Sequence, residues 1–254
     1  MNQYLSSVSL KSLAKGQLLG KYGTVVGILL LQLLCTAPIN LAISALIGTN
    51  SVLSILLYSI AQFLFGLFAG YFFAGQNYVY LKIACNQMPM ASDLFYFFRE
   101  DVSKVLYIQV ILSGVSTLCS LPSLIAWHYV NLSMLELSSG TLATDELPIN
   151  GSLFLAYAVL YVAGNAINIY VRYILFSQVF YLMLDFPDYS APQLLKMSIQ
   201  LIKGSRARLF YLLVSFVPLL LLGVFSCGIA LLWIQPYMQA TYANFYLDLI
   251  KKKK

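Results

Sequence analysis

Six long apolar segments joined by short polar connectors constrain this 254-residue chain more than any other feature of its sequence. Each segment is long enough to cross a bilayer, whose hydrocarbon core takes roughly 20 helical residues. In lipid a segment must satisfy its own backbone hydrogen bonds, and these segments lack the alternating polarity of barrel strands. We therefore predict an all-α polytopic transmembrane helix bundle with six spans, at about 22–47, 52–81, 105–130, 153–184, 209–226 and 229–249.

The composition fits a surface that mostly faces lipid. Only 9% of the residues are charged, whereas soluble proteins use about a quarter. No connector is long enough to fold separately, so we expect a single integral membrane domain over residues 1–254. The net charge of +6 comes from small basic groups between the spans. Because these groups do not share one face, nucleic acid is not expected as a partner.

The distribution of Lys and Arg predicts the orientation of the chain. Basic residues lie before the first predicted span, after the second, after the fourth and after the sixth, but not in the outer connectors, of which 131–151 is the longest. Cytoplasmic loops of membrane proteins carry such an excess of positive charge. We expect both termini in the cytoplasm, and we expect three inner-face residues to contact anionic lipid: Lys203, Arg206 and Arg208.

Turn residues and prolines subdivide the predicted bundle. Asn50 with Ser51, and Cys227 with Gly228, are expected to form tight outer turns, which would arrange the six spans as three hairpins. Proline inside a membrane helix removes a backbone hydrogen bond and kinks the helix. Kinks are expected at four prolines within the predicted spans: Pro38, Pro122, Pro218 and Pro236.

Three cytoplasmic connectors are predicted to form short amphipathic helices at the membrane interface, at 9–17, 92–104 and 190–203. In the third, Ser190 and Gln193 have the spacing of a capping box, in which each side chain bonds the backbone of the other. Pro192 stands early in the same helix, where its missing N–H costs little.

The connectors and spans also suggest a threefold internal repeat of about 80 residues. Each copy would consist of an interfacial helix, an outward span, an inward span and an aromatic exit segment. The three exit segments, 76–81, 178–182 and 244–247, align on Tyr80, Tyr181 and Tyr246. Such copies would surround an axis normal to the membrane.

Arg172 is the candidate ligand-binding residue, together with Asn168 and Gln178 among the polar residues of the spans. A cation within a membrane is costly unless it is paired, solvated or able to reach the headgroups. Counted from the outer end of its span, Arg172 could reach the inner headgroups. Alternatively it faces an internal polar cavity, where a lipid phosphate or an anionic ligand would be its partner.

Small residues on the second span suggest close helix packing. Gly66, Gly70 and Ala74 recur every four residues and therefore share one helix face. The contact could lie inside the bundle or between two copies of the chain, and the oligomeric state is left open.

No catalytic or metal-binding pattern is found in the sequence. His128 is the single histidine, which makes a His-based metal site or acid–base pair improbable. The four cysteines are isolated; a disulfide between Cys119 and Cys227, both near the predicted outer side, is left open. We therefore expect no enzyme activity, no cofactor and no metal.

The C-terminal third resembles a known family. Its features are Lys203-Gly204-Ser205-Arg206 and the run from Cys227 through Trp233 to Tyr237, ending in Asn244-Phe245-Tyr246. This part is similar to the bacterial integral-membrane family catalogued as domain of unknown function 975. The resemblance extends over nearly the whole chain and implies a multi-pass protein of the bacterial plasma membrane, without an established activity.

These observations lead to two expected functions. The first is a non-enzymatic membrane accessory or scaffold protein that interacts with membrane lipids and with other membrane proteins. The second is a small-molecule or ion transporter or channel in which Arg172 faces the internal cavity.

Overall fold

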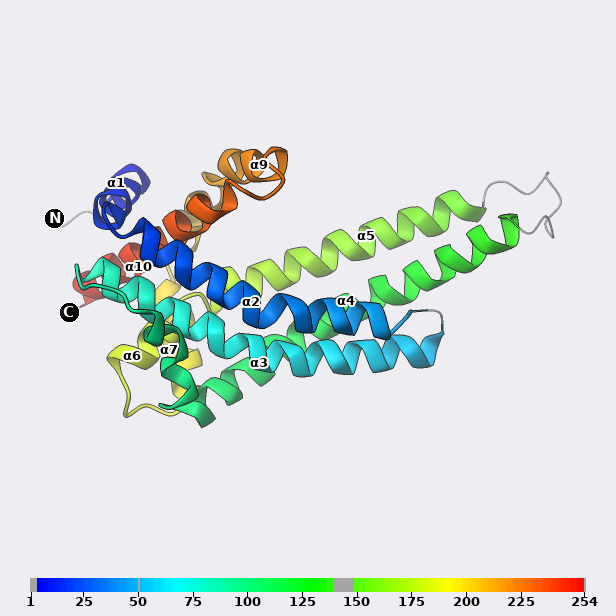
Figure 1. Ribbon diagram of the computed structural model, residues 1–254, viewed down its shortest axis with the longest axis horizontal. Helices are drawn as coiled ribbons and strands as arrows, with labels where there is room; N and C mark the ends of the chain where they lie inside the picture. Colours follow the sequence, from blue (N-terminus) through cyan, green and yellow to red (C-terminus); the bar gives the residue numbers. More distant parts are fainter. Residues whose placement is uncertain (1–3, 50, 139–148, 254) are drawn as a thin grey trace. The chain divides into compact units, whose positions relative to one another are not determined.

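The computed structural model describes residues 4–49, 51–138 and 149–253, which are helical and contain no β-strand (Figure 1). The elements are α1 (Ser7–Leu18), α2 (Tyr22–Leu46), α3 (Val52–Ala84), η1 (Ala91–Phe98), α4 (Val102–Ser138), α5 (Ile149–Ile169), η2 (Tyr170–Leu175), α6 (Val179–Asp185), α7 (Ala191–Ile202), α8 (Arg206–Val214), α9 (Val217–Phe225) and α10 (Leu231–Lys253).

The chain forms two compact units. Unit 1 consists of Met1–Thr36, Ala69–Ile108 and Tyr173–Lys254, and unit 2 consists of Ala37–Phe68 and Gln109–Arg172. Three long helices, α2, α3 and α4, contribute one part to each unit. Unit 1 also holds the short helices α1, η1, α6, α7, α8 and α9, whereas the short helix η2 is divided between the two units.

Among the described residues, five helical segments are long and apolar enough to cross a membrane. They match the first five predicted spans, and the fourth and fifth each combine neighbouring helices. The segments are Tyr22–Leu46, Val52–Ala84, Val102–Ser133, Gly151–Asp185 and Arg206–Phe225. These helices make the chain a membrane-protein candidate with an all-α fold.

The sixth predicted span corresponds to α10, which is not one of the five. Its sequence includes Gln235, Gln239, Asn244 and Asp248, and these polar residues lower its mean hydropathy. The helix is nevertheless deeply buried in unit 1, where every residue from 240 to 246 is buried. Its surroundings are therefore largely protein.

Several predicted boundaries are corrected by the structure. Helix α4 continues to Ser138, so 131–138 belongs to a helix and not to the predicted outer connector; the rest of that connector, up to residue 148, lies outside the described residues. The second helix predicted to be interfacial is a 3₁₀ helix that ends at Phe98, and Asp101, at φ 54°, precedes the start of α4. Positive φ interrupts a right-handed helix because of steric crowding at Cβ.

The prolines follow two patterns. Pro38, Pro122 and Pro236 lie inside α2, α4 and α10, as predicted. Pro218 instead lies in the first turn of α9, where its missing N–H would have had no helical partner. The predicted fifth span is therefore two helices, α8 and α9, that meet at Ser215 and Phe216.

The turn between α9 and α10 contains two residues with left-handed backbone, Cys227 at φ 50° and Gly228 at φ 88°. Beside this turn, a Cβ on Gly223 would come within 2.4 Å of the Leu231 side chain, so the two helices approach closely there. All four cysteines are free, and the disulfide considered between Cys119 and Cys227 is not formed.

Candidate functional site

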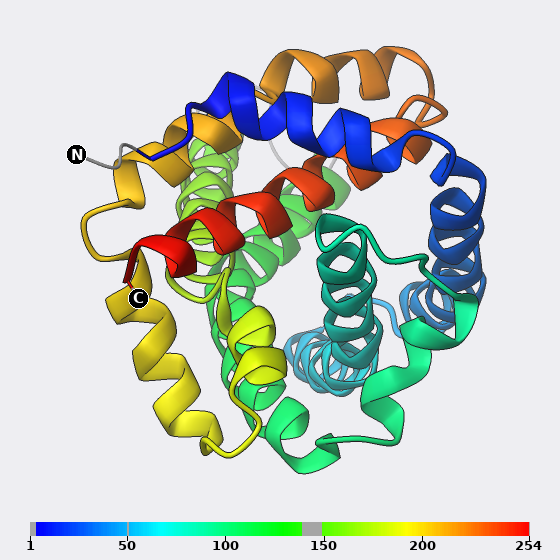
Figure 2. The same ribbon diagram turned by 90° about the vertical axis from the view of Figure 1, so that its left-hand side faces the viewer.

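The three connector helices of unit 1, α1, η1 and α7, each pack against one of the predicted exit segments. Helix α1 lies along α10, as Figure 2 shows, and fully buries Leu10, Ala14 and Leu18. These residues are four apart and form one apolar face. Beyond that face, Gln17 donates to the carbonyl of Ala84 at 3.0 Å and accepts from Asn244 at 2.7 Å. Helix α1 thus joins α3 to α10.

The connector helix η1 packs on the last third of α3. A Cβ on Gly75 would lie 2.0 Å from the carbonyl oxygen of Leu94, so the backbones touch at this point. Lys82 forms an ion pair with Asp93 at 2.7 Å. Asp93 also caps η1 by accepting from the backbone N–H of Met90 at 2.8 Å. Only glycine at 75 allows this contact.

Helix α7 packs on α6. Its buried face includes Leu194, Ser198 and Ile202, each fully buried, and the Ser198 hydroxyl donates to the carbonyl of Leu175 at 2.9 Å. At its start, Ser190 and Gln193 form the predicted capping box, with the Ser190 N–H donating to Gln193 at 2.9 Å. The capping box and the apolar face both follow from the sequence of this helix.

Three basic residues, one at the start of each of α2, α4 and α8, donate hydrogen bonds to the segments that lead into the connector helices. Lys21 donates to the carbonyl of Gln87 at 3.0 Å, ahead of η1. Lys104 donates to the carbonyl of Pro187, ahead of α7. Arg208 donates to the carbonyl of Leu5 at 2.8 Å, ahead of α1. The same kind of bond therefore occurs three times, and the third joins the beginning of the described chain to α8.

The exit segments form the centre of unit 1. Tyr80, Tyr181 and Tyr246 are among its largest fully buried side chains. The rings of Tyr181 and Tyr246 stack with centroids 5.0 Å apart, and the Tyr246 hydroxyl donates to Asp185 at 2.6 Å. In the described part of the chain the buried hydroxyls of Tyr181 and Tyr242 have no hydrogen-bond partner. This centre is polar and tightly packed.

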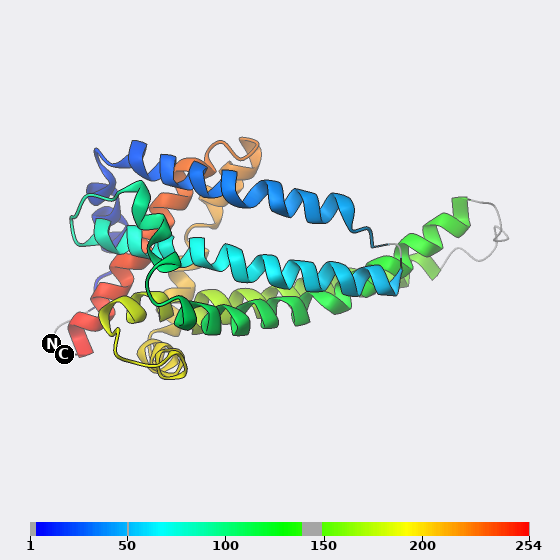
Figure 3. The ribbon, with the colours of Figure 1, turned by 60° about the horizontal axis from the view of Figure 1, so that its bottom comes forward.

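The end of α10 lies beside the start of α1 (Figures 1 and 3). Asp248 accepts from Arg208 in an ion pair and from the N–H of Leu5 at 3.4 Å. The Arg208 guanidinium also lies 4.8 Å from the ring centroids of Tyr4 and Phe245. Cation–π contacts of this kind add to the ion pair when the group is shielded from water.

A second contact of α1 places Lys11 against α8 and the start of α9. Its ammonium donates to the carbonyl of Ser215 at 3.0 Å and lies 4.1 Å from the centroid of the Phe216 ring. Burial, and to a smaller extent the nearby charge of Lys15, lowers the pKa of Lys11. Both effects disfavour the charged form.

The structure does not bring Arg172, Asn168 and Gln178 together through any hydrogen bond among the described residues. Asn168 donates to Ser116 at 2.8 Å within unit 2. Gln178, fully buried in unit 1, donates to Ser177 at 2.9 Å. Arg172 lies in the short π-helix η2, and its buried Nε has no partner in the described part of the chain.

The small residues predicted for packing lie in different environments. Gly66, in unit 2, faces α4: a Cβ there would meet the Ser113 hydroxyl at 2.7 Å. Gly70 and Ala74, in unit 1, are buried. Sequence reasoning did not single out Gly75 or Gly164, although a Cβ on Gly164 would meet the carbonyl oxygen of Cys119 at 2.3 Å. The sequence around these two glycines could not predict their contacts, because the backbone that approaches each glycine belongs to another helix.

The three residues predicted to contact anionic lipid also differ. Lys203 is exposed and Arg206 is partly buried, whereas Arg208 is engaged by Asp248 and Leu5. In the described residues the buried Nε of Arg206 lacks a partner. Lys196 was not among these three candidates; it is exposed on α7, and Lys203 is exposed just after the end of α7. Both lysines are therefore open to an external partner.

Within the described residues no group of three or more His, Cys, Asp or Glu side chains could hold a metal ion.

No curated protein and no solved structure matches the chain. The family model described as "Protein of unknown function (DUF975)" matches residues 1–253. The match covers α1, the exit segments and the basic residues described above, and the chain belongs to the DUF975 family.

Proposed function

We propose that this DUF975 protein is a non-enzymatic accessory or scaffold protein of the bacterial plasma membrane, in contact with membrane lipids and other membrane proteins. The observation that carries the proposal is the recurring bond from Lys21, Lys104 and Arg208 to the segment ahead of a connector helix. These basic groups are used to hold three connector helices together. In this proposal the three connector helices α1, η1 and α7 form a platform on the cytoplasmic side of the membrane.

The proposal includes six spans, arranged as three hairpins with one hairpin in each of three repeats, and both termini in the cytoplasm. Its support for the sixth span is that the polar groups of α10 bond to protein: Asn244 with Gln17, Tyr246 with Asp185, and Asp248 with Arg208. Polar side chains paired in this way are tolerated between membrane helices. Low mean hydropathy is therefore compatible with a span shielded from lipid by its neighbours.

The repeat is supported by a common packing order. Connector helix η1 packs on α3, α7 packs on α6, and α1 packs on α10. Helices η1 and α7, which begin the second and third copies, each contact the exit segment of the preceding copy. Helix α1, which begins the first copy, contacts the exit segment of the third copy. Such a closed order is what three parallel repeats around one axis would produce.

The lipid contact is assigned to the outward face of α7. Leu194, Ser198 and Ile202 bury the opposite face in protein, which leaves Lys196 and Lys203 exposed. Anionic headgroups attract lysines near the surface with roughly 1 kcal/mol for each charge. The two lysines, one on α7 and one just after it, would thus favour anionic lipid beside the platform.

The test is lipid selection by the whole protein in nanodiscs of phosphatidylglycerol and phosphatidylcholine, followed by native mass spectrometry. Lys196→Gln with Lys203→Gln should reduce the enrichment of phosphatidylglycerol by about thirtyfold, from the roughly 1 kcal/mol assigned to each of the two charges. The control Lys196→Arg with Lys203→Arg should retain it. Unchanged enrichment in the Gln variant, or turnover of either lipid by the pure protein, would contradict the proposal.

A transport function is the second candidate, and one observation favours it. Arg172 lies in η2, and π-helical turns are frequent at functional sites. Its buried Nε, without a partner among the described residues, could receive an anionic ligand. Flux of labelled anions into proteoliposomes that Arg172→Met abolishes and Arg172→Lys reduces would support transport. No flux in the unmodified protein across a panel of anions would exclude this assignment of Arg172.

A further inference from the structure

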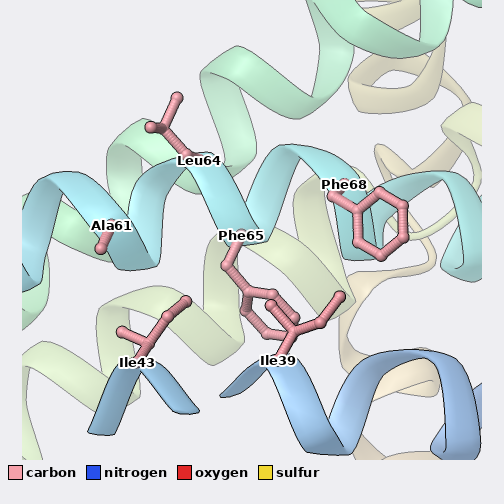
Figure 4. A pocket seen from close by; sticks show the side chains of 6 residues that line it. All are labelled: Ile39, Ile43, Ala61, Leu64, Phe65 and Phe68. Carbon is pink, nitrogen blue, oxygen red and sulfur yellow. The ribbon is translucent and has the colours of Figure 1, made fainter. Parts of the chain in front are cut away.

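An open apolar groove lies between α2 and α3 in unit 2 (Figure 4). It has a volume of about 380 Å³ and is lined by Ile39, Ile43, Ala61, Leu64, Phe65 and Phe68. The first two side chains come from α2 and the other four from α3, and Phe65 points toward Ile39. Leu64 and Ile39 are 57% and 41% exposed, so the groove opens to the outside of the unit.

The surroundings of the groove restrict what can occupy it. Both helices are long and apolar enough to cross a membrane, and lipid tails are the apolar medium around such helices. The lining is entirely apolar, with side chains from two neighbouring span helices and a volume of about 380 Å³. A single flexible hydrocarbon chain fits its size and its apolar lining.

A polar pair flanks the groove. Gln62 donates to the Asn40 side-chain oxygen at 3.0 Å and to the Tyr58 hydroxyl at 3.2 Å. Asn40 follows Ile39 and Gln62 follows Ala61, so the pair adjoins the lining. Asn40 is exposed, and in the described part of the chain its side-chain N–H groups donate no hydrogen bond. An exposed donor inside a membrane span requires an acceptor.

The position of Asn40 in α2 places this donor near one membrane surface. Asn40 is followed by six residues before α2 ends at Leu46, which corresponds to about 9 Å at the helical rise. A 25-residue helix is about 37 Å long and exceeds the roughly 30 Å hydrocarbon core by a few ångströms at each end. The donor therefore lies within reach of the ester groups of a lipid.

We propose that this groove is a glycerophospholipid site, in which one acyl chain lies along Ile39, Ala61 and Phe65 and Asn40 donates to an ester oxygen. The inference rests on the proposed six-span topology, in which this end of α2 is the outer one. The lipid therefore belongs to the outer leaflet. The site is separate from the inner-face lysines Lys196 and Lys203 and recognises the chain and glycerol ester, not the charge of the headgroup.

The test is photo-cross-linking of the whole protein in nanodiscs of phosphatidylcholine doped with the same lipid carrying a diazirine on one acyl chain. Peptide mapping should locate the adducts on residues that line the groove. Ala61→Trp fills the groove and should reduce these adducts to the level of other lipid-facing positions. Leu56→Trp, on another face of α3 and 48% exposed, is the matched control and should leave them unchanged.

Asn40→Ala provides a second variant that leaves the groove open. It should weaken retention of the lipid during detergent washing while adducts still map to the groove. Adducts spread evenly over the exposed helices, or unchanged in Ala61→Trp, would overturn the proposal, as would cross-links to a second copy at these residues. Because Lys196 and Lys203 do not take part, loss of headgroup selection with groove adducts intact would count against the proposed function alone.

Discussion

At the scale of single residues, the packing of unit 1 depends on positions where a different side chain would not fit or would lose its partners. Gly75 is the clearest, because the carbonyl oxygen of Leu94 stands where its Cβ would be. Arg208 is another, with Asp248, Leu5 and two aromatic rings around one guanidinium. Such positions are sensitive because the atoms that would have to move belong to a second element.

Gly75→Ala is expected to destabilise the protein by about 2 kcal/mol, the usual cost of overpacking a tight contact. Because the neighbour is backbone, the distance between α3 and η1 must increase. Gly27→Ala is the matched control in α2, where a Cβ would meet nothing within 4 Å; it should be neutral or stabilise by up to about 1 kcal/mol. Denaturation in detergent micelles measures both. Equal stability of the two variants would contradict the close approach at Gly75.

Arg208→Met is expected to cost about 3–5 kcal/mol, because it leaves a shielded carboxylate without a partner. The ion pair is well covered, with 19% of the Arg208 side chain and 12% of the Asp248 side chain exposed. Adding Asp248→Asn to the variant should recover part of the loss. A double-mutant cycle in detergent measures the coupling, and simple additivity of the two changes would show that the pair is not formed.

At the scale of elements, three connector helices of different types perform the same role. Helices α1 and α7 are α-helical, whereas η1 is a 3₁₀ helix of eight residues. Each buries one apolar face against an exit segment, and each is preceded by a segment that a basic residue holds. The packing partner therefore matters more than the exact helical geometry.

The contact of α1 with α10 predicts a specific cross-link. Gln17 and Asn244 bond at 2.7 Å, so cysteines at both positions should be joined rapidly by a short thiol-specific linker. The experimental variant combines Gln17→Cys with Asn244→Cys. The control variant combines Ser12→Cys with Asn244→Cys, because Ser12 is exposed on another face of α1. Cross-linking yield on denaturing gels is the measurement, and equal yields from the two pairs would rule out the described packing of α1.

At the scale of the whole molecule, the main proposal is that the chain crosses a membrane six times with its basic residues on the inner side. Cys85, just after α3, and Cys227, in the turn before α10, are exposed thiols at ends that this topology places on opposite sides. They provide natural reporters of orientation without any added residue.

A membrane-impermeant maleimide applied to intact cells should label Cys227 and leave Cys85 unlabelled until the membrane is opened. Burial, followed by the nearby charge of Asp185, raises the pKa of Cys85. A raised pKa leaves less thiolate at neutral pH, so its labelling in opened membranes should be slow at pH 7 and accelerate as the pH rises. Cys85→Ser and Cys227→Ser identify the bands. Labelling of Cys85 in intact cells would contradict the orientation.

Much of the local structure could be predicted from the sequence because its causes are local. Apolar length predicted the five long helical segments, and the spacing of Ser190 and Gln193 predicted the capping box of α7. The break at Pro218 was missed, although proline at the start of a helix explains it. The reach of α4 to Ser138 was also missed, because the polar residues there resemble a connector.

What the sequence determined by itself is the class of the protein, since a chain with long apolar helices and 9% charged residues needs an apolar environment. What only the tertiary structure decided is how polar groups are used. Arg208 resembles a lipid-binding residue in sequence, yet Asp248 and Leu5, far from it in the chain, engage it. Gly75 carries no sequence signal because its constraint comes from Leu94 in another helix. Hydropathy is a sum along the chain, whereas pairing and close approach depend on which segments meet.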